Sequence, residues 1–311
     1  MGDILYLCTI KMKQMKKIFA LAAVAMMAAM SAQAQRLRVG EPEGSGMEEE
    51  VVNAYFTQGE MPDMMVFLPG PPDSTSVAFM NDVARYYWGK EMRKDPERAA
   101  QATRDAVYGL ETILTEFEEA FGMKITKEDT PEIYKVLLEG TATCDSICTK
   151  PKREYMRRRP FMVFNEPTLT PEDEEALRKN GSFPSGHTLL GWSSALLMME
   201  INPDRATEIL ARGYRYGENR LVVGAHWQSD TDAARLAASA AYARLHTSER
   251  FLEQMKKARA EYAEKTGQTT EVRALNASPQ QSARIYRIDG TPADKTTRGI
   301  VIEEGKKKIV P

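Results

Sequence analysis

The sequence predicts an all-α fold, a compact helical bundle, followed by a short C-terminal β-rich extension. Between about residues 61 and 267, successive segments carry apolar residues at three- and four-residue spacing, the period of a helix that buries one face. Several of these segments begin with Ser, Thr, Asp or Pro in capping positions. With 311 residues, 42% of them hydrophobic, the chain is long enough to bury one good core and a small appendage.

The N-terminus has the pattern of a secretory signal. Lysines 11, 13, 16 and 17 precede a run of apolar residues, 18–30, and the small-residue motif Ala32-Gln33-Ala34 follows it. We therefore expect a signal peptide at 1–34 and a periplasmic or secreted protein. The alternative, a buried core helix, fits poorly with the lysines before the apolar run and the small residues after it. The run is also short for a membrane span.

The segments after the signal divide into a leader and a helical domain. Residues 35–60 are polar and rich in Gly and Glu, which predicts a leader with little to bury. The helical domain is expected at 61–267, with helical segments at 76–94, 96–122, 130–159, 187–201, 203–225, 226–246 and 248–267. Its longest apolar run, 189–199, is shorter than the roughly 20 residues of a spanning helix. No integral membrane span is expected after signal removal.

Residues 268–311 change in character, which predicts a linker and a small β-type extension. Segments 283–288, 299–304 and 306–311 alternate apolar and polar residues around Asp-Gly and Glu-Gly turns. The tail is loosely similar to C-terminal segments of exported proteins that use, or resemble users of, type IX secretion. Two interpretations stay open: a dispensable extension packed on the helical domain, or a sorting or surface-attachment segment.

Charge and cysteine content argue against a nucleic-acid-binding function and against a metal site. The formal net charge of −2 argues against a nucleic-acid partner. Cys144 and Cys148 remain after signal removal, four residues apart in a predicted helix, where disulfide geometry is strained. Free thiols are favoured and a disulfide stays open. No other Cys or His pair lies nearby, so no metal site is predicted.

The stretch NGSFPSGHTLLGW, residues 180–192, is typical of an anion-binding helix start. Ser185 can act as N-cap, so that the amides of Gly186 and His187 point out of the first turn without helical partners. Such a turn binds anions. The missing side chain of Gly186 allows a phosphate oxygen to approach the backbone, and His187 adds an acid/base group.

Two further pairs of residues point to phosphate chemistry. Lys152 and Arg159 are seven residues apart, so on a continuous helix both would project from one face just before Pro160 stops it. His226 and Asp230 are four apart, so on a helix the carboxylate could orient the imidazole and leave one ring nitrogen free as a nucleophile. Taken singly, each pair also has a non-functional interpretation, such as a solvated helix face or a surface contact.

Taken together, the motifs resemble the signature of the phosphatidic-acid-phosphatase type 2 and vanadium haloperoxidase superfamily. The sequence contains Lys-x6-Arg-Pro, Pro-Ser-Gly-His and Arg-x5-His-x3-Asp in this order, the last beginning at Arg220. The flanks YMRRRPF, KNGSFPSGHT, EINP, RGYRYGENR and HWQSDTDAARLAASA are similar to the bacterial class A non-specific acid phosphatases. This resemblance extends over about residues 71–262.

The resemblance implies hydrolysis of phosphate monoesters through a phosphohistidine, with a broad substrate range. It implies that the phosphoryl oxygens are bound by Lys152, Arg159, Ser185, Gly186 and Arg220. His226 would attack phosphorus, Asp230 would orient it and stabilise its positive charge, and His187 would protonate the leaving alcohol. Three cations and helix-start amides can neutralise the phosphoryl oxygens, so neither a cofactor nor a metal is expected.

Two positions depart from the family pattern, and some alternatives remain. Asn219 stands where the family usually has Ser, so phosphate affinity is expected to shift rather than the reaction; Val223 replaces a cysteine of many relatives. His246 matches no motif position, and a structural role is expected. A vanadate-dependent haloperoxidase and a non-catalytic phosphate-binding exported protein remain as alternatives, whereas a membrane lipid phosphatase lacks its spans. A homo-oligomer is left open.

Overall fold

The computed structural model describes residues 36–38, 51–267, 285–287, 292–293, 298–303 and 306–310. The predicted signal peptide and half of the predicted leader lie outside the described residues, as does the linker-like stretch after residue 267. The chain divides into two compact units, Met1–Gly267 and Gln268–Pro311.

The first unit is helical, which confirms the all-α prediction for this part of the chain. Its α-helices are α2 (Met64–Phe67), α3 (Val77–Met92), α4 (Pro96–Arg104), α5 (Leu110–Phe121), α6 (Pro131–Asp145), α7 (Thr149–Tyr155), α8 (Pro160–Phe164), α9 (Glu174–Arg178), α10 (Gly186–Ile201), α11 (Ala206–Val223), α12 (Gln228–Leu245) and α13 (Glu249–Thr266). Short 3-10 turns lie at Gln58–Glu60, Ser146–Cys148, Pro171–Asp173 and Pro203–Arg205. Strand β1 (Arg36–Arg38) pairs antiparallel with β2 (Val51–Asn53).

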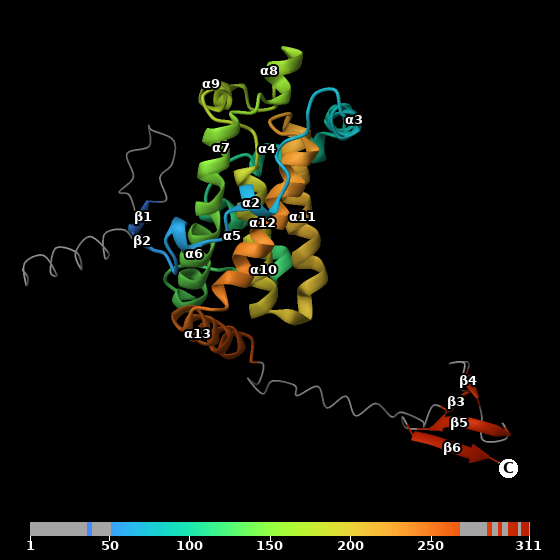
Figure 1. Ribbon diagram of the computed structural model, residues 1–311. Coiled ribbons are helices and arrows are strands. Elements are labelled where there is room, and N and C mark those ends of the chain that lie inside the picture. The colour runs from blue at the N-terminus through green and yellow to red at the C-terminus, as the bar shows by residue number, and fades with distance from the viewer. Residues whose placement is uncertain are drawn as a thin grey trace, which may run out of the picture. The chain divides into compact units, whose positions relative to one another are not determined.

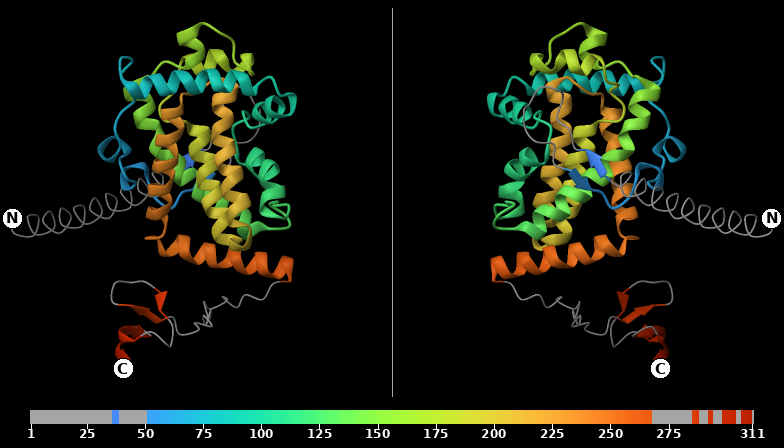
Figure 2. Two further views of the ribbon diagram at one scale, coloured as in Figure 1. Left: turned by 90° about the vertical axis from the view of Figure 1, so that its right-hand side faces the viewer. Right: turned by 90° about the vertical axis from the view of Figure 1, so that its left-hand side faces the viewer.

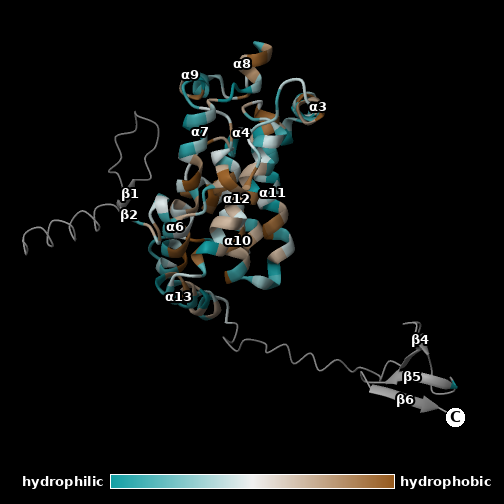
Figure 3. Cartoon of the chain, in the orientation of Figure 1, coloured by the Kyte–Doolittle hydropathy of each residue, from teal (hydrophilic) through white to brown (hydrophobic). Residues whose placement is uncertain are grey.

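Helix α10 lies at the centre of this unit. It packs against α6, α11 and α12, and both its apolar residues, such as Leu189 and Leu197, and its small ones, such as Ser194, are fully buried. Figures 1 and 2 show the long helices side by side, with α3 across one end and α13 across the other. Hydrophilic and hydrophobic residues mix along most helices, including α13, as expected for helices that bury one face (Figure 3).

Two predicted helices are broken, and both breaks lie near the candidate site. The segment 96–122 divides into α4 and α5, because Gly109, with φ of 149°, takes a conformation outside the helical region. Between the two helices, the buried carboxylate of Asp105 accepts hydrogen bonds from Arg212 and Asn219 of α11. The segment 130–159 divides into α6, a 3-10 turn and α7, and its last residues are not helical.

Cys144 and Cys148 are free and buried, so the disulfide that the sequence left open does not form in this structure. Burial raises the pKa of both thiols. The thiol of Cys148 contacts the carboxylate of Asp145 at 3.5 Å. Both groups therefore behave as buried, unreactive side chains.

The described residues of the second unit are short strands: β3 (Ile285–Arg287), β4 (Pro292–Ala293), β5 (Gly299–Glu303) and β6 (Lys306–Val310). They pair antiparallel in the order β4-β3-β5-β6. Among the described residues of the whole chain, no helix is both long and apolar enough to cross a bilayer.

Candidate active site

The N-terminal end of α10 forms one wall of the site. Ser185 is the N-cap, as the sequence predicts, and its hydroxyl accepts a hydrogen bond from the amide of Thr188 at 3.2 Å. The amide of Ser185 donates to the carbonyl of Asp230 at 3.1 Å, which joins this turn to the start of α12. A Cβ at Gly186 would lie 3.7 Å from Cε of Lys152. The first turn of α10 therefore lies beside the side chain of Lys152.

Lys152 and Arg159 converge on one carbonyl, but not through a shared helix face. Helix α7 ends at Tyr155, Met156 takes left-handed backbone angles, and Arg159 lies beyond the helix as the N-cap of α8. The prediction of one continuous helix face is wrong. The side chains meet because Nζ of Lys152 and Nη2 of Arg159 both donate to the carbonyl of Gly181, at 3.0 and 3.3 Å.

The loop before α10 packs against the end of α7, and this packing explains the early end of the helix. A Cβ at Gly181 would collide with the carbonyl oxygen of Lys152, so only glycine allows the two backbones to come this close. The amide of Ser182 then donates to the carbonyl of Arg157 at 2.9 Å. Contacts between the two loops replace the next helical hydrogen bonds.

Three cations gather in this region without a carboxylate partner among the described residues. Arg159 and Arg220 are each only 1% exposed, and Lys152 is half-buried. Nε and Nη1 of Arg220 are buried and have no hydrogen-bond partner in the described part of the chain. Buried positive charge is unfavourable unless an anion compensates it. The cluster is therefore built to receive a negatively charged group.

Burial lowers the pKa values of these three side chains, but they stay protonated in acidic solution. It lowers the pKa of Arg159 and Arg220 to about 10. The pKa of Lys152 falls to about 8, because the ammonium is desolvated and Arg159 adds a second positive charge nearby. All three side chains remain positively charged in acidic and neutral solution.

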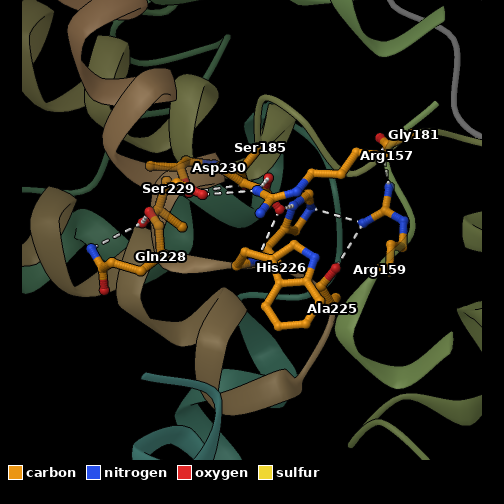
Figure 4. Close-up of polar contacts among 12 residues, drawn as sticks. Arg157, Arg159, Gly181, Ser185, Ala225, His226, Gln228, Ser229 and Asp230 are labelled. Atoms are coloured by element: carbon orange, nitrogen blue, oxygen red, sulfur yellow. Dashed lines mark hydrogen bonds and ion pairs between the residues drawn. The ribbon is translucent and has the colours of Figure 1, made fainter. Parts of the chain in front are cut away.

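His226 lies just before α12 and has both ring nitrogens engaged (Figure 4). Nδ1 lies 3.2 Å from Oδ2 of Asp230, and Nε2 lies 2.9 Å from Nη1 of Arg159. The predicted pair is therefore present, but not on a helix face. Trp227 is the N-cap of α12, and Asp230 bends back to accept from the amide of Trp227 at 2.9 Å. This capping contact brings the carboxylate to the ring.

The partners of His226 determine where its proton lies. A guanidinium only donates hydrogen bonds and a carboxylate only accepts them, so the neutral ring carries its proton on Nδ1 and a lone pair on Nε2. Burial and the positive charges of Arg159, Lys152 and Arg220 hold the pKa of His226 well below its usual range. The lowered pKa favours the neutral form of the ring in mildly acidic solution.

His187 lies on the first turn of α10 and is oriented by the loop between α4 and α5. Its Nε2 donates to the carbonyl of Ala106 at 2.8 Å, and its ring meets the ring of Tyr108 edge-on with centroids 4.9 Å apart. Burial, followed by the charge of Arg220, holds the pKa of His187 well below its usual range. A bound anion would oppose this shift, because negative charge favours the imidazolium.

Sequence reasoning missed a second charged network behind Asp230. Arg157 donates to Oδ1 of Asp230 at 2.5 Å and to Oδ2 of Asp82 at 2.7 Å. Asp82 also accepts from the amide and the hydroxyl of Ser229, at 2.7 and 2.6 Å. The run RRR at 157–159 shows positive charge but not which arginine turns inwards, and nothing local marks Asp82, which lies far away in the sequence.

Asn219, Val223 and His246 lie outside the cluster of cations. The amide of Asn219 is engaged by Asp105 at 2.6 Å and by Arg98, so it supports a buried network instead of reaching a phosphate. Val223 is fully buried at the end of α11. His246 is half-buried and contacts Glu200 at 3.1 Å. The described residues contain no group of three or more His, Cys, Asp or Glu side chains arranged to hold a metal ion.

Comparison with known proteins agrees with this geometry. Residues 134–250 match the PAP2 superfamily. The chain is 42% identical over 223 residues to a non-specific acid phosphatase of Providencia stuartii, covering 71% of this chain and 90% of that protein. The chain belongs to the bacterial class A acid phosphatases. A non-specific acid phosphatase of Salmonella typhimurium is 39% identical, over 70% of this chain and 86% of that protein. An acid phosphatase of Zymomonas mobilis is 36% identical, over 64% of this chain and 75% of its own length.

Membership of the class A acid phosphatases makes the chain a hydrolase. The matched superfamily region contains all eight of the site residues predicted from the sequence. It also contains Arg157, whereas Asp82 lies before it. The region that the superfamily description covers therefore leaves out part of the charged network around Asp230.

Proposed function

We propose that the chain is an exported acid phosphatase that hydrolyses a broad range of phosphate monoesters through a phosphohistidine at His226. The observation that carries the proposal is the Nε2 lone pair of a buried, neutral imidazole beside the cations Arg159, Lys152 and Arg220. The cations would bind the phosphoryl oxygens, together with the hydroxyl of Ser185 and the amide of Gly186.

In the first step, Nε2 of His226 forms a bond to phosphorus while the bond from phosphorus to the ester oxygen breaks. His187, protonated once the phosphate dianion is bound, donates its proton to the departing alkoxide. The positive charge that develops on His226 is stabilised through Nδ1 by Asp230, and the cations stabilise the negative charge of the equatorial oxygens.

In the second step, a water oxygen attacks phosphorus from the side that the alcohol has left. His187, now neutral, accepts a proton from this water, and the bond from phosphorus to Nε2 breaks. When inorganic phosphate leaves, His187 releases its proton to solvent, and both histidines are again neutral. Neither reaction step requires a metal ion, since the three cations and the helix-start amides supply the electrophilic contacts to the phosphoryl group.

The test is hydrolysis of p-nitrophenyl phosphate in excess EDTA, at acidic and at neutral pH. We expect full activity in the chelator, competitive inhibition by vanadate at the phosphate site, and an acid-labile phosphate on His226 after rapid quenching. Loss of activity in EDTA with recovery on adding zinc or magnesium would contradict the mechanism. Phosphate binding without turnover would favour a binding protein, and halide oxidation with vanadate would favour a haloperoxidase.

Lys152 is expected to limit phosphate binding in alkaline solution. Its ammonium is charged below its pKa of about 8 and neutral above it, so the affinity for inorganic phosphate should fall as pH rises through 8. The inhibition constant of phosphate, measured from pH 6 to pH 9.5, would rise about tenfold per pH unit on the alkaline side, as expected when a single proton is lost.

Lys152→Arg separates this explanation from a general loss of structure. Guanidinium stays protonated over the whole range, so the alkaline loss of phosphate affinity should move to higher pH in this variant. Lys150→Arg, on the same helix but exposed and paired with Asp63, serves as the matched control and should keep the wild-type profile. An unchanged profile in Lys152→Arg would show that another group is titrated.

We also propose export to the periplasm or the medium, with residues 268–311 as a small β-rich extension that has a role in sorting or surface attachment. All eight proposed site residues precede Asp232, so a chain truncated after Gly267 should keep its turnover number. In its native host, however, it should divide differently between periplasm, membrane fraction and medium. A folded but inactive truncated chain would refute the domain boundary, and an active chain distributed like the full-length protein would refute the sorting role.

A further inference from the structure

Each oxygen of the Asp230 carboxylate contacts a different set of partners. Oδ2 faces Nδ1 of His226 and the amide of Trp227, whereas Oδ1 accepts from Nη1 of Arg157 at 2.5 Å. The Asp230 side chain is fully buried and Arg157 is 8% exposed. Figure 4 shows the side chain of Arg157 extending to Asp230 and Ser229. The orientation of the carboxylate therefore depends on Arg157.

Arg157 is itself fixed by a residue from the distant helix α3. Its Nη2 donates to Oδ2 of Asp82 at 2.7 Å, and its Nη1 donates to the hydroxyl of Ser229 at 2.8 Å. Asp82 is fully buried and accepts both the amide and the hydroxyl of Ser229. Both acids and the arginine thus find partners within one closed network, which joins α3, the segment after α7 and the start of α12.

The charges of this network suit the proposed reaction step. Two carboxylates and one guanidinium sum to one negative charge, which is opposite to the charge that His226 acquires when it bonds to phosphorus. Arg157 alone would cancel the charge of Asp230, and Asp82 restores it. Because the network is buried, these charges interact strongly with one another. Phosphate binding, by contrast, depends on cations that make no contact with Asp82.

We infer that Asp82 and Arg157 are positioning residues that orient Asp230 and maintain the negative charge behind His226 during phosphoryl transfer. The inference rests on the proposed phosphohistidine mechanism. It assigns to α3, outside the matched superfamily region, a function in the chemical step rather than in phosphate binding.

The test uses Asp82→Asn, which keeps the side-chain shape but removes the charge, and Arg157→Lys, which keeps the charge but loses the two-pronged contact. We expect the rate of His226 phosphorylation in a single turnover to fall about 10- to 100-fold in each, by analogy with the loss found when residues that orient metal ligands are replaced. The inhibition constant of inorganic phosphate should stay within about twofold of wild type, since the phosphate-binding groups are unchanged.

Two exposed neighbours provide matched controls: Glu91→Gln on α3 and Arg158→Lys beside Arg157, both expected to behave as wild type. Unchanged phosphorylation rates in Asp82→Asn and Arg157→Lys would overturn the inference, as would a parallel loss of phosphate affinity, rate and melting temperature, which would show a purely structural role. Absence of any phosphohistidine in the wild-type enzyme would instead refute the proposed mechanism, so the two failures are distinguishable.

Discussion

His226→Ala is expected to have essentially no turnover, whereas His187→Ala is expected to retain activity on substrates with good leaving groups. Removal of a nucleophile eliminates the covalent route and typically costs about 10⁴- to 10⁶-fold in kcat. His187 assists only the departure of the alcohol and the activation of water. Its loss should cost about 10²- to 10⁴-fold for an alkyl phosphate and much less for p-nitrophenyl phosphate, whose leaving group needs little protonation.

The measurement is kcat for p-nitrophenyl phosphate and for an alkyl phosphate in both variants. His246→Ala is the natural control, because it removes the third histidine of the chain, which contacts Glu200 and no proposed site residue. Equal losses on good and poor leaving groups in His187→Ala would contradict the assignment of its role. Substantial turnover in His226→Ala would exclude it as the nucleophile.

Arg220→Met is expected to reduce kcat/KM about 10³-fold and yet to stabilise the free protein. The guanidinium is buried, and its Nε and Nη1 have no partner in the described part of the chain, so it costs free energy until an anion arrives. Replacement of buried charge by an apolar side chain of similar length can stabilise a protein by about 1 to 4 kcal/mol. Loss of one positively charged contact to the transferring phosphoryl group accounts for the kinetic effect.

Thermal unfolding with and without inorganic phosphate tests both halves of this prediction. Phosphate should raise the melting temperature of the wild-type protein through its binding free energy and should raise that of Arg220→Met far less. Arg215→Met, on the same helix but exposed and paired with Glu218, should leave both quantities near wild type. A variant that is less stable than wild type would show that Arg220 supports the fold rather than the ligand.

The sequence by itself predicted most of the helical unit. The three- and four-residue spacing of apolar residues, together with N-caps such as Ser185 and Ser248, predicted helices whose starts agree with the structure within a residue or two. These signals are local, because an N-cap or a helix period depends on neighbours within one or two turns. The order of three short motifs also indicated the family and the phosphate chemistry.

Local reasoning failed where distant segments compete with the helix. It extended one helix through Met156 to Arg159 and placed His226 on a helix, because spacing alone cannot show that a loop from elsewhere will satisfy the backbone. Here Gly181 packs on the end of α7, and Asp230 caps α12 from within. The cations and the histidine therefore meet through loops and not through a shared helix face.

The sequence determined which residues could carry the chemistry, and the tertiary structure decided which of them act on one another. Nothing near Asp82 in the chain indicates its contact with Arg157, because the two are 75 positions apart and meet only when α3 crosses the end of the bundle. Likewise, the low pKa of His226 and the unpartnered guanidinium nitrogens of Arg220 arise from burial. Burial is a property of the packed chain, since water is excluded only once all the surrounding helices are in place.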